Sequence, residues 1–220
     1  MELYEAMRCA PTSRRFTDEP VEPAAIERAL DAARFAPSGG NRQGWRVVVV
    51  RDPDTRRALR DLYLPHWRAY MEVTGGAQML AQPDAFDQKR TRMVQRANEY
   101  AEHLDEVPVH FVLGVQLSDL AVTDDALPRT SIVGGASVYP FAQNLLLALR
   151  NEGLGASMTT LLVPAEAEVR ELLGIPDDVA LAAHIGAGHR ADPWPKQLSR
   201  KPVGEFAFAE RFGEPLQRAD

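Results

Sequence analysis

Short polar side chains and glycines are concentrated in one ten-residue stretch, residues 36–45, between a helical pattern and the valine run 47–50. Glycine and asparagine adopt backbone angles that other residues avoid, so a Pro-Ser-Gly-Gly-Asn sequence predicts a sharp turn. Such a turn exposes backbone N–H groups and short polar side chains, which suit an oxygen-rich ligand. An ordinary helix-to-strand turn would explain the glycines alone. Asn41, Gln43 and Trp45 directly after them favour a binding role.

Two basic clusters lie near the ends of the chain, at residues 12–15 and 199–201. The first is Thr-Ser-Arg-Arg and the second is Ser-Arg-Lys. Arginine holds a phosphate through two parallel hydrogen bonds, which suits a mononucleotide with a terminal phosphate. Either cluster alone is more typical of a solvated surface.

Other chemistries lack their sequence patterns. The five histidines show no metal-binding spacing, and the single cysteine, Cys9, allows no intrachain disulfide and is expected to be buried. There is no G-x-S-x-G turn of a serine hydrolase. The glycines at 186–188 are followed by His-Arg-Ala-Asp-Pro and not by a helix, so a dinucleotide-binding Rossmann motif is disfavoured. We therefore expect no metal site.

Length and charge set broad limits. A chain of 220 residues with 45% hydrophobic residues forms one domain, which we take as residues 1–220. A net charge of −6 argues against nucleic acid as a partner. The sequence starts without a signal-peptide pattern and has no apolar run of about 20 residues. We expect a cytoplasmic protein that does not bind membranes.

Hydrophobic periodicity predicts strands near residues 47, 108, 157 and 180 with helices between them, which is an α+β or α/β arrangement. A nearly all-apolar helix around Leu145 is expected in the core or at a subunit interface. The segment 65–104, with Trp67 and Tyr70, is a candidate helical lid over a substrate, although ordinary helix packing would also explain it. The segment 192–220 is expected to be an extension docked on a neighbouring surface.

The stretch 36–45 resembles the Ala-Pro-Ser-x-x-Asn-x-Gln-Pro-Trp signature of the FMN-dependent nitroreductase superfamily, with Gly44 in place of the usual proline. Further segments follow in the family's order. They are the opening Leu-Tyr-Glu-Ala-Met, the arginine-rich segment 13–16, the helix sequence 142–148 with its glycines at 153–155, and the segments 185–188 and 200–202.

This resemblance implies a central, mainly antiparallel sheet flanked by helices, in an intertwined homodimer with a swapped C-terminal tail. FMN would lie at the dimer interface. Arg14 and Arg200 would hold its phosphate, and the backbone N–H near Thr160 or Leu161 would donate to the flavin nitrogen that accepts the hydride. The full set of cofactor-binding residues that it implies is Thr12, Ser13, Arg14, Pro37, Ser38, Gly39, Asn41, Gln43, Thr159, Thr160, Leu161, Arg200 and Lys201.

The chain departs from the family pattern beside the phosphate. Ala10 and Pro11 stand where arginine or histidine is usual, so one phosphate contact is lost unless Arg8 replaces it. Leu198 stands where some relatives carry a basic residue. These changes predict weaker FMN binding.

The resemblance implies an FMN-dependent oxidoreductase that takes hydride from NADH or NADPH and reduces a small nitroaromatic or quinone. No side chain is expected to act as a nucleophile. Two alternatives stay open: dehalogenation or flavin fragmentation on the same fold, and a non-catalytic flavin-binding protein. The deazaflavin F420 in place of FMN is also left open, and we disfavour it.

Overall fold

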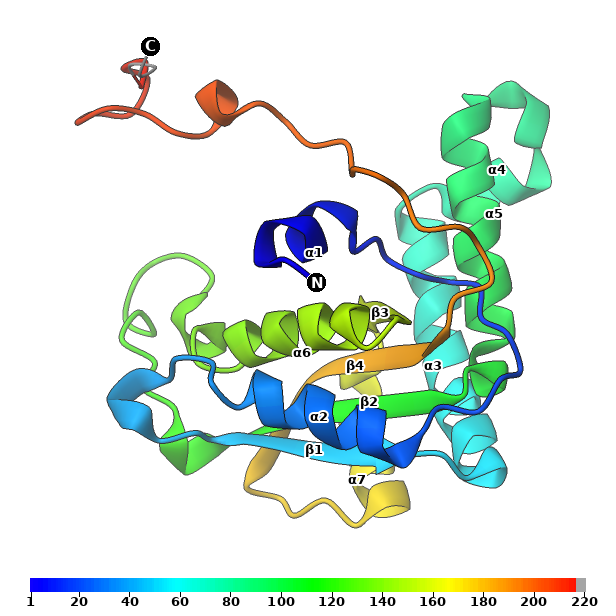
Figure 1. The fold of residues 1–220 in the computed structure, drawn as a ribbon, viewed down its shortest axis with the longest axis horizontal. Helices are drawn as coiled ribbons and strands as arrows, with labels where there is room; N and C mark the ends of the chain where they lie inside the picture. The colour runs from blue at the N-terminus through cyan, green and yellow to red at the C-terminus, as the bar shows by residue number, and fades with distance from the viewer. Residues whose placement is uncertain (217–220) are drawn as a thin grey trace.

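A four-stranded antiparallel sheet with the order β1-β2-β4-β3 forms the centre of the protein, in a computed structural model that describes residues 1–216 (Figure 1). Its strands are β1 (Trp45–Val50), β2 (Val109–Gln116), β3 (Leu154–Thr159) and β4 (Val179–His189). Since the strands that pair are antiparallel and helices cover the sheet, the α+β class is confirmed. All four strands lie where the hydrophobic periodicity placed them.

Helices α2 (Pro23–Ala33) and α6 (Tyr139–Asn151) pack side by side on one face of the sheet (Figure 1). Phe141, Leu145 and Leu149 are buried against this face, because a spacing of about four residues keeps them on one side of α6. Helix α1 (Leu3–Cys9) contacts the outer side of α6. The glycine after α6, Gly153, has φ +81°, the left-handed conformation in which many helices end.

The opposite face is covered by α3 (Pro53–Val73), α4 (Gly76–Ala81), α5 (Gln88–Glu102) and α7 (Glu166–Leu173). In Figure 1 the amino-terminal part of α5 and α4 project beyond the sheet. Helix α3 begins at an Asp52 side-chain cap, whose carboxylate accepts from the Thr55 N–H at 2.8 Å. It continues through Pro65, so the helical segment starts at residue 53 and residue 65 is not an element boundary.

Residues 190–216 leave β4 as an extended segment that crosses α1 and continues past it (Figure 1). The Leu198 N–H donates to the Arg8 carbonyl at 2.8 Å. Farther along, Phe206 and Phe212 are 64% and 93% exposed. The segment also contains a helical turn, Val203–Glu205, and folds back where Phe208 pairs with Pro215, and residues 217–220 lie outside the described part. No helix among the described residues is long and apolar enough to span a bilayer.

Two histidines face each other inside the sheet. His110 on β2 and His184 on β4 are fully buried, with 2.7 Å between His110 Nδ1 and His184 Nε2 and ring centroids 4.9 Å apart. Burial lowers the pKa of His184 to about 4. Burial, with the His184 ring and Arg56 as further causes, also lowers the pKa of His110 well below its ordinary value. Both rings are therefore neutral at pH 7, and one donates its N–H to the other.

This pair predicts acid sensitivity. Because both rings bind a proton more weakly in the folded chain, the stability that they confer is full above the ordinary pKa of 6.5 and is lost as the pH falls toward about 4. The loss from His184 is on the order of 3 kcal/mol. Chemical denaturation of the wild type and of His184→Gln, repeated between pH 7 and pH 4, should give a shallower pH dependence for the variant. The same pH dependence of the unfolding free energy in both proteins would contradict the lowered pKa of His184.

Candidate functional site

The N-terminal segment lies along the edge of β3 and the end of β4. The Ser13 N–H donates to the Ala156 carbonyl at 2.8 Å, and Thr12 pairs with the same residue of β3. Ser13 is fully buried, and its Oγ accepts from Arg190 Nη1 at 2.9 Å. A Cβ on Gly155 would lie 2.6 Å from the Ser13 Oγ, so only glycine lets the segment approach this closely. This contact determines where Thr12 and Arg14 lie.

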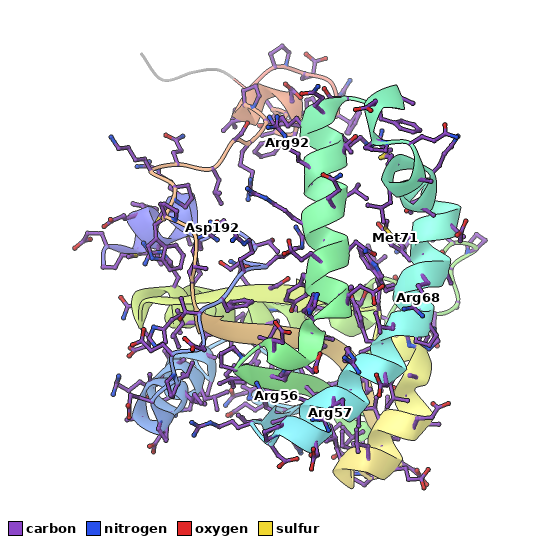
Figure 2. All side chains as sticks on the ribbon, turned by 90° about the vertical axis from the view of Figure 1, so that its right-hand side faces the viewer. Arg56, Arg57, Arg68, Met71, Arg92 and Asp192 are labelled. Carbon is purple, nitrogen blue, oxygen red and sulfur yellow. The ribbon has the colours of Figure 1, made fainter. Side chains whose placement is uncertain are left out.

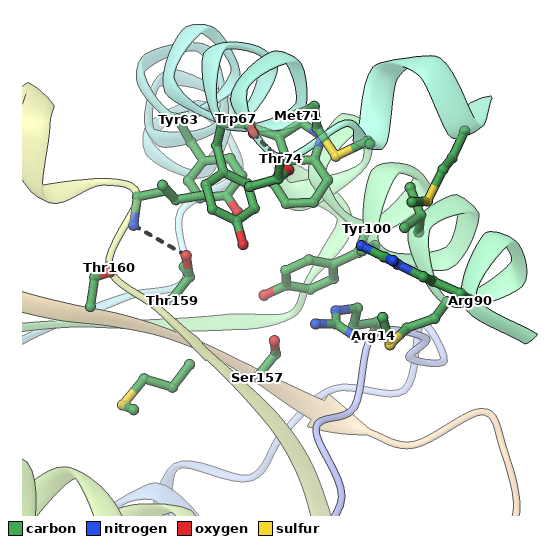
Figure 3. A pocket seen from close by; sticks show the side chains of 18 residues that line it. Arg14, Tyr63, Trp67, Met71, Thr74, Arg90, Tyr100, Ser157, Thr159 and Thr160 are labelled. Carbon is green, nitrogen blue, oxygen red and sulfur yellow. Dashed lines mark hydrogen bonds between the residues drawn. The ribbon is translucent and has the colours of Figure 1, made fainter. Parts of the chain in front are cut away.

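Arg14 enters a cavity of 470 Å³ between the sheet and the helices α3 and α5. Figure 3 shows Arg14 and Tyr100 reaching toward its centre, above Ser157 of β3. The wall opposite β3 is aromatic and sulfur-rich. The lining of the whole cavity includes Tyr63, Trp67, Tyr70, Met71, Met79, Met93, Thr159, Thr160 and Leu161.

The charged side chains in this lining are Arg14 and Arg90, and among the described residues it contains no carboxylate. Burial raises the pKa of both Tyr63 and Tyr100, so each hydroxyl stays protonated and can donate a hydrogen bond. The buried Tyr100 hydroxyl has no hydrogen-bond partner within residues 1–216. An unpaired donor that faces a cavity is suited to a ligand oxygen or ring nitrogen.

The backbone after β3 has one of its two predicted donors in use. The Leu161 N–H donates to Thr159 Oγ1 at 3.2 Å, which leaves the Thr160 N–H as the candidate for a flavin nitrogen. Trp67 is 8% exposed and donates through Nε1 to Asn98 Oδ1 at 2.9 Å, so it is a fixed wall residue. Tyr70 is 47% exposed and lies at the rim.

A second cavity of 440 Å³ lies beside Ala10, Pro11 and Thr12. Its two charged residues are Arg150, in the last turn of α6, and Arg200, from the extended C-terminal segment. Thr12 lines this cavity, and Met158 lines both this cavity and the first one.

Arg150 is held in a fixed position. Its Cζ lies 3.8 Å from the centroid of the Trp194 ring, and its Nη2 donates to Cys9 Sγ at 3.4 Å. Its buried Nε has no partner within residues 1–216. The side chain of Arg8, by contrast, is exposed and absent from the lining of this cavity. The cations beside Ala10 and Pro11 are therefore Arg200 and Arg150, and Arg150 was not among the phosphate ligands expected from the sequence.

The predicted phosphate ligands are divided between cavities. Arg14 lines the first cavity, whereas Arg200 lines the second. Lys201 is exposed, and its Nζ lies 3.7 Å from a carboxylate oxygen of Glu205.

The turn at residues 37–43 lies at the opposite end of the sheet from α3 and α5 (Figure 1), the helices that line the Arg14 cavity. Its Gly39 N–H donates to Ser137 Oγ at 3.1 Å, and the Gln43 N–H donates to Ser38 Oγ at 3.0 Å. Asn41 and Gln43 have φ values of 53° and 52°, a left-handed conformation that costs energy for a residue with a side chain. Within one chain, Pro37, Ser38, Gly39, Asn41 and Gln43 are thus separated from Thr12, Ser13, Arg14, Thr159, Thr160 and Leu161.

The model of the nitroreductase family matches residues 11–189. The chain belongs to the nitroreductase family. It is 31% identical over 188 residues to an NADH dehydrogenase of Thermus thermophilus, covering 81% of this chain and 82% of the relative. It is 29% identical to iodotyrosine deiodinase 1 of Rattus norvegicus, covering 86% of this chain and 62% of the deiodinase.

The fold agrees with this assignment. The crystal structure of an FMN and NADPH-dependent nitroreductase from Sphigopyxis sp. strain HMH superposes with a TM-score of 0.69, at 22% identity, over 96% of this chain and 100% of that chain. The nitroreductase-like fold expected from residues 36–45 is therefore confirmed. The family match covers the turn, the Arg14 segment and all four strands.

Replacing Gly155 with alanine should displace the segment that carries Thr12 and Arg14. The new methyl group would overlap Ser13, at a cost of about 1–3 kcal/mol in unfolding free energy. Denaturant titration measures this cost. Gly204→Ala is the matched control, because nothing lies within 4 Å of its Cβ position. Equal stability of both variants would show that Gly155 is not a constraint.

Proposed function

We propose that the protein is an FMN-dependent oxidoreductase that passes hydride from NADH or NADPH to a small oxidised aromatic substrate. The observation that carries this proposal is the pair of adjoining cavities that share Met158. One is lined by two guanidinium groups beside a threonine hydroxyl, and the other by aromatic side chains, Arg14 and an unpaired tyrosine hydroxyl.

The donor set of the second cavity fits the phosphate of FMN. Arg150 and Arg200 supply two cations, Thr12 supplies a hydroxyl, and among the described residues no carboxylate opposes them. Arg150 is oriented by Trp194, so little side-chain freedom would be lost on binding. In this arrangement Arg150 compensates for the missing family cations at Ala10 and Pro11.

The first cavity suits the flavin ring. The Thr160 N–H and the Tyr100 hydroxyl would donate to ring atoms, and Arg14 would favour negative charge that develops on the ring during reduction. Bound FMN would supply the hydride chemistry. Tyr63, Trp67 and Met71 form the wall that would exclude water, and the exposed Tyr70 at its rim is the residue best placed to act as a lid.

A homodimer would complete the site. The polar turn at 37–43 lies far from the Arg14 cavity of its own chain, so a second copy would have to bring the Ser38 and Asn41 side chains to the flavin. Exposed apolar residues support this assembly. Leu3, Tyr4 and Met7 on α1 are at least half exposed, as are Phe206 and Phe212 on the extended segment. The C-terminal segment would then pack on the partner.

The lining of the second cavity argues against one of the alternatives. The alternative of a non-catalytic flavin-binding protein rests on the loss of phosphate contacts at Ala10 and Pro11. Arg150 weakens that alternative, because with Arg200 the cavity still has two cations to bind a phosphate.

The first experiment is a visible absorption spectrum of the protein after addition of FMN and dialysis. We expect about one FMN per chain and steady-state NAD(P)H oxidation with a quinone or nitroaromatic acceptor. Retained flavin without turnover across several acceptors would favour the non-catalytic alternative, and no retained flavin would contradict the proposal.

Arg150→Ala should weaken FMN binding by about tenfold or more, because a charge-assisted hydrogen bond to the phosphate is lost. Riboflavin has no phosphate, so its dissociation constant should stay the same. Both constants follow from quenching of flavin fluorescence. Arg8→Ala removes a nearby charge outside the cavity and serves as the control. A comparable loss for FMN and riboflavin would mean that Arg150 acts on the fold and not on the phosphate.

A further inference from the structure

A third cavity, of 370 Å³, lies between α5 and two neighbouring segments, residues 12–15 and 190–192. In Figure 2 Arg92 projects from α5 on the side of the segment that carries Asp192. Six of its lining residues are cationic and one is acidic. The lining consists of Thr12, Arg14, Arg15, Lys89, Arg92, Met93, Arg96, Arg190 and Asp192.

The positive charge of this cavity is only partly neutralised. Asp192 lies 3.1 Å from Arg15 and 3.9 Å from Arg190. Lys89, Arg92 and Arg96 form no ion pair with any residue between 1 and 216.

The three α5 cations lie on one face of the helix. Their spacing of three and four residues brings like charges together, which destabilises a helix unless an anion lies between them. The chain as a whole has a net charge of −6, so this concentration of cations is local.

The cavity adjoins the proposed flavin-ring cavity. Arg14 and Met93 line both. Along α5 the cations extend for about 10 Å at 1.5 Å per residue. A long anion whose ring stacked on the flavin at the first cavity would therefore extend its charged groups along this face of α5.

We propose that this cavity binds the phosphate groups of the hydride donor and makes the protein select NADPH over NADH. This inference rests on the proposed function, since it assigns the nicotinamide nucleotide of the same reaction. NADPH differs from NADH by one 2′-phosphate, which adds about −1.5 to −2 charges at pH 7. The guanidinium groups of Arg92 and Arg96 would bind that group, and the pyrophosphate would contact Arg190.

The test compares Arg92→Ala/Arg96→Ala with the wild type. We expect the wild type to show a kcat/KM at least about tenfold higher for NADPH than for NADH, and the double variant to lose most of that ratio, because one or two charge-assisted hydrogen bonds disappear. Arg57→Ala/Arg68→Ala is the matched control. It removes the same charge from exposed arginines of α3 that lie outside this cavity.

A second measurement does not depend on turnover. Calorimetry with 2′,5′-ADP and with 5′-AMP should show tighter binding of the former to the wild type, and loss of that difference in Arg92→Ala/Arg96→Ala. An equal kcat/KM of the wild type for NADPH and NADH would overturn the inference. An equal fall in kcat/KM for both dinucleotides in Arg92→Ala/Arg96→Ala would overturn it as well. A flavin-loaded protein that oxidises neither nucleotide but discriminates 2′,5′-ADP would contradict the proposed function alone.

Discussion

The site depends on one backbone contact, in which the edge of β3 accepts the N-terminal segment through the Ser13 N–H and the Ala156 carbonyl. Gly155 makes this approach possible because a side chain there would occupy the space of Ser13. On one side of the contact Thr12 lines the cavity of Arg150 and Arg200, and on the other Arg14 lines the aromatic cavity. Arg190 is fixed by the same Ser13 hydroxyl.

Much of the fold follows from the sequence, because a valine run marks β1 and glycine or proline marks several helix ends. The valines at 47–50 predict β1, and Gly153, which follows α6, has a positive φ. Pro65 is the exception. Proline alone favours a helix break, yet Leu59, Trp67 and Met71 of α3, on both sides of it, pack into the hydrophobic core between the sheet and the helices α3, α5 and α7. Tertiary packing outweighs the local preference there.

The parts of the site that lie in one stretch of sequence were predictable, and those built by distant contacts were not. Thr12 and Arg14 have recognisable neighbours in the sequence. Arg150, however, lies 140 positions from Ala10, and only the packing of α1 and the C-terminal segment on α6 brings the two into one cavity. Similarly, Lys89, Arg92 and Arg96 resemble the solvated face of an amphipathic helix until Arg14 and Arg190 are placed opposite them. Helical spacing from Gln143 through Leu146 and Leu147 to Arg150 was the available signal.

The distance between the turn at 37–43 and the Arg14 cavity has a thermodynamic consequence for the proposed dimer. A flavin held by groups from two chains would bind weakly to either chain alone. Flavin binding would therefore stabilise the dimer, and dimer formation would raise the affinity for flavin. Reciprocity requires the two effects to be equal in free energy. Dilution would then release cofactor and separate subunits together, and the strained backbone of Asn41 and Gln43 would be offset only in the assembled state.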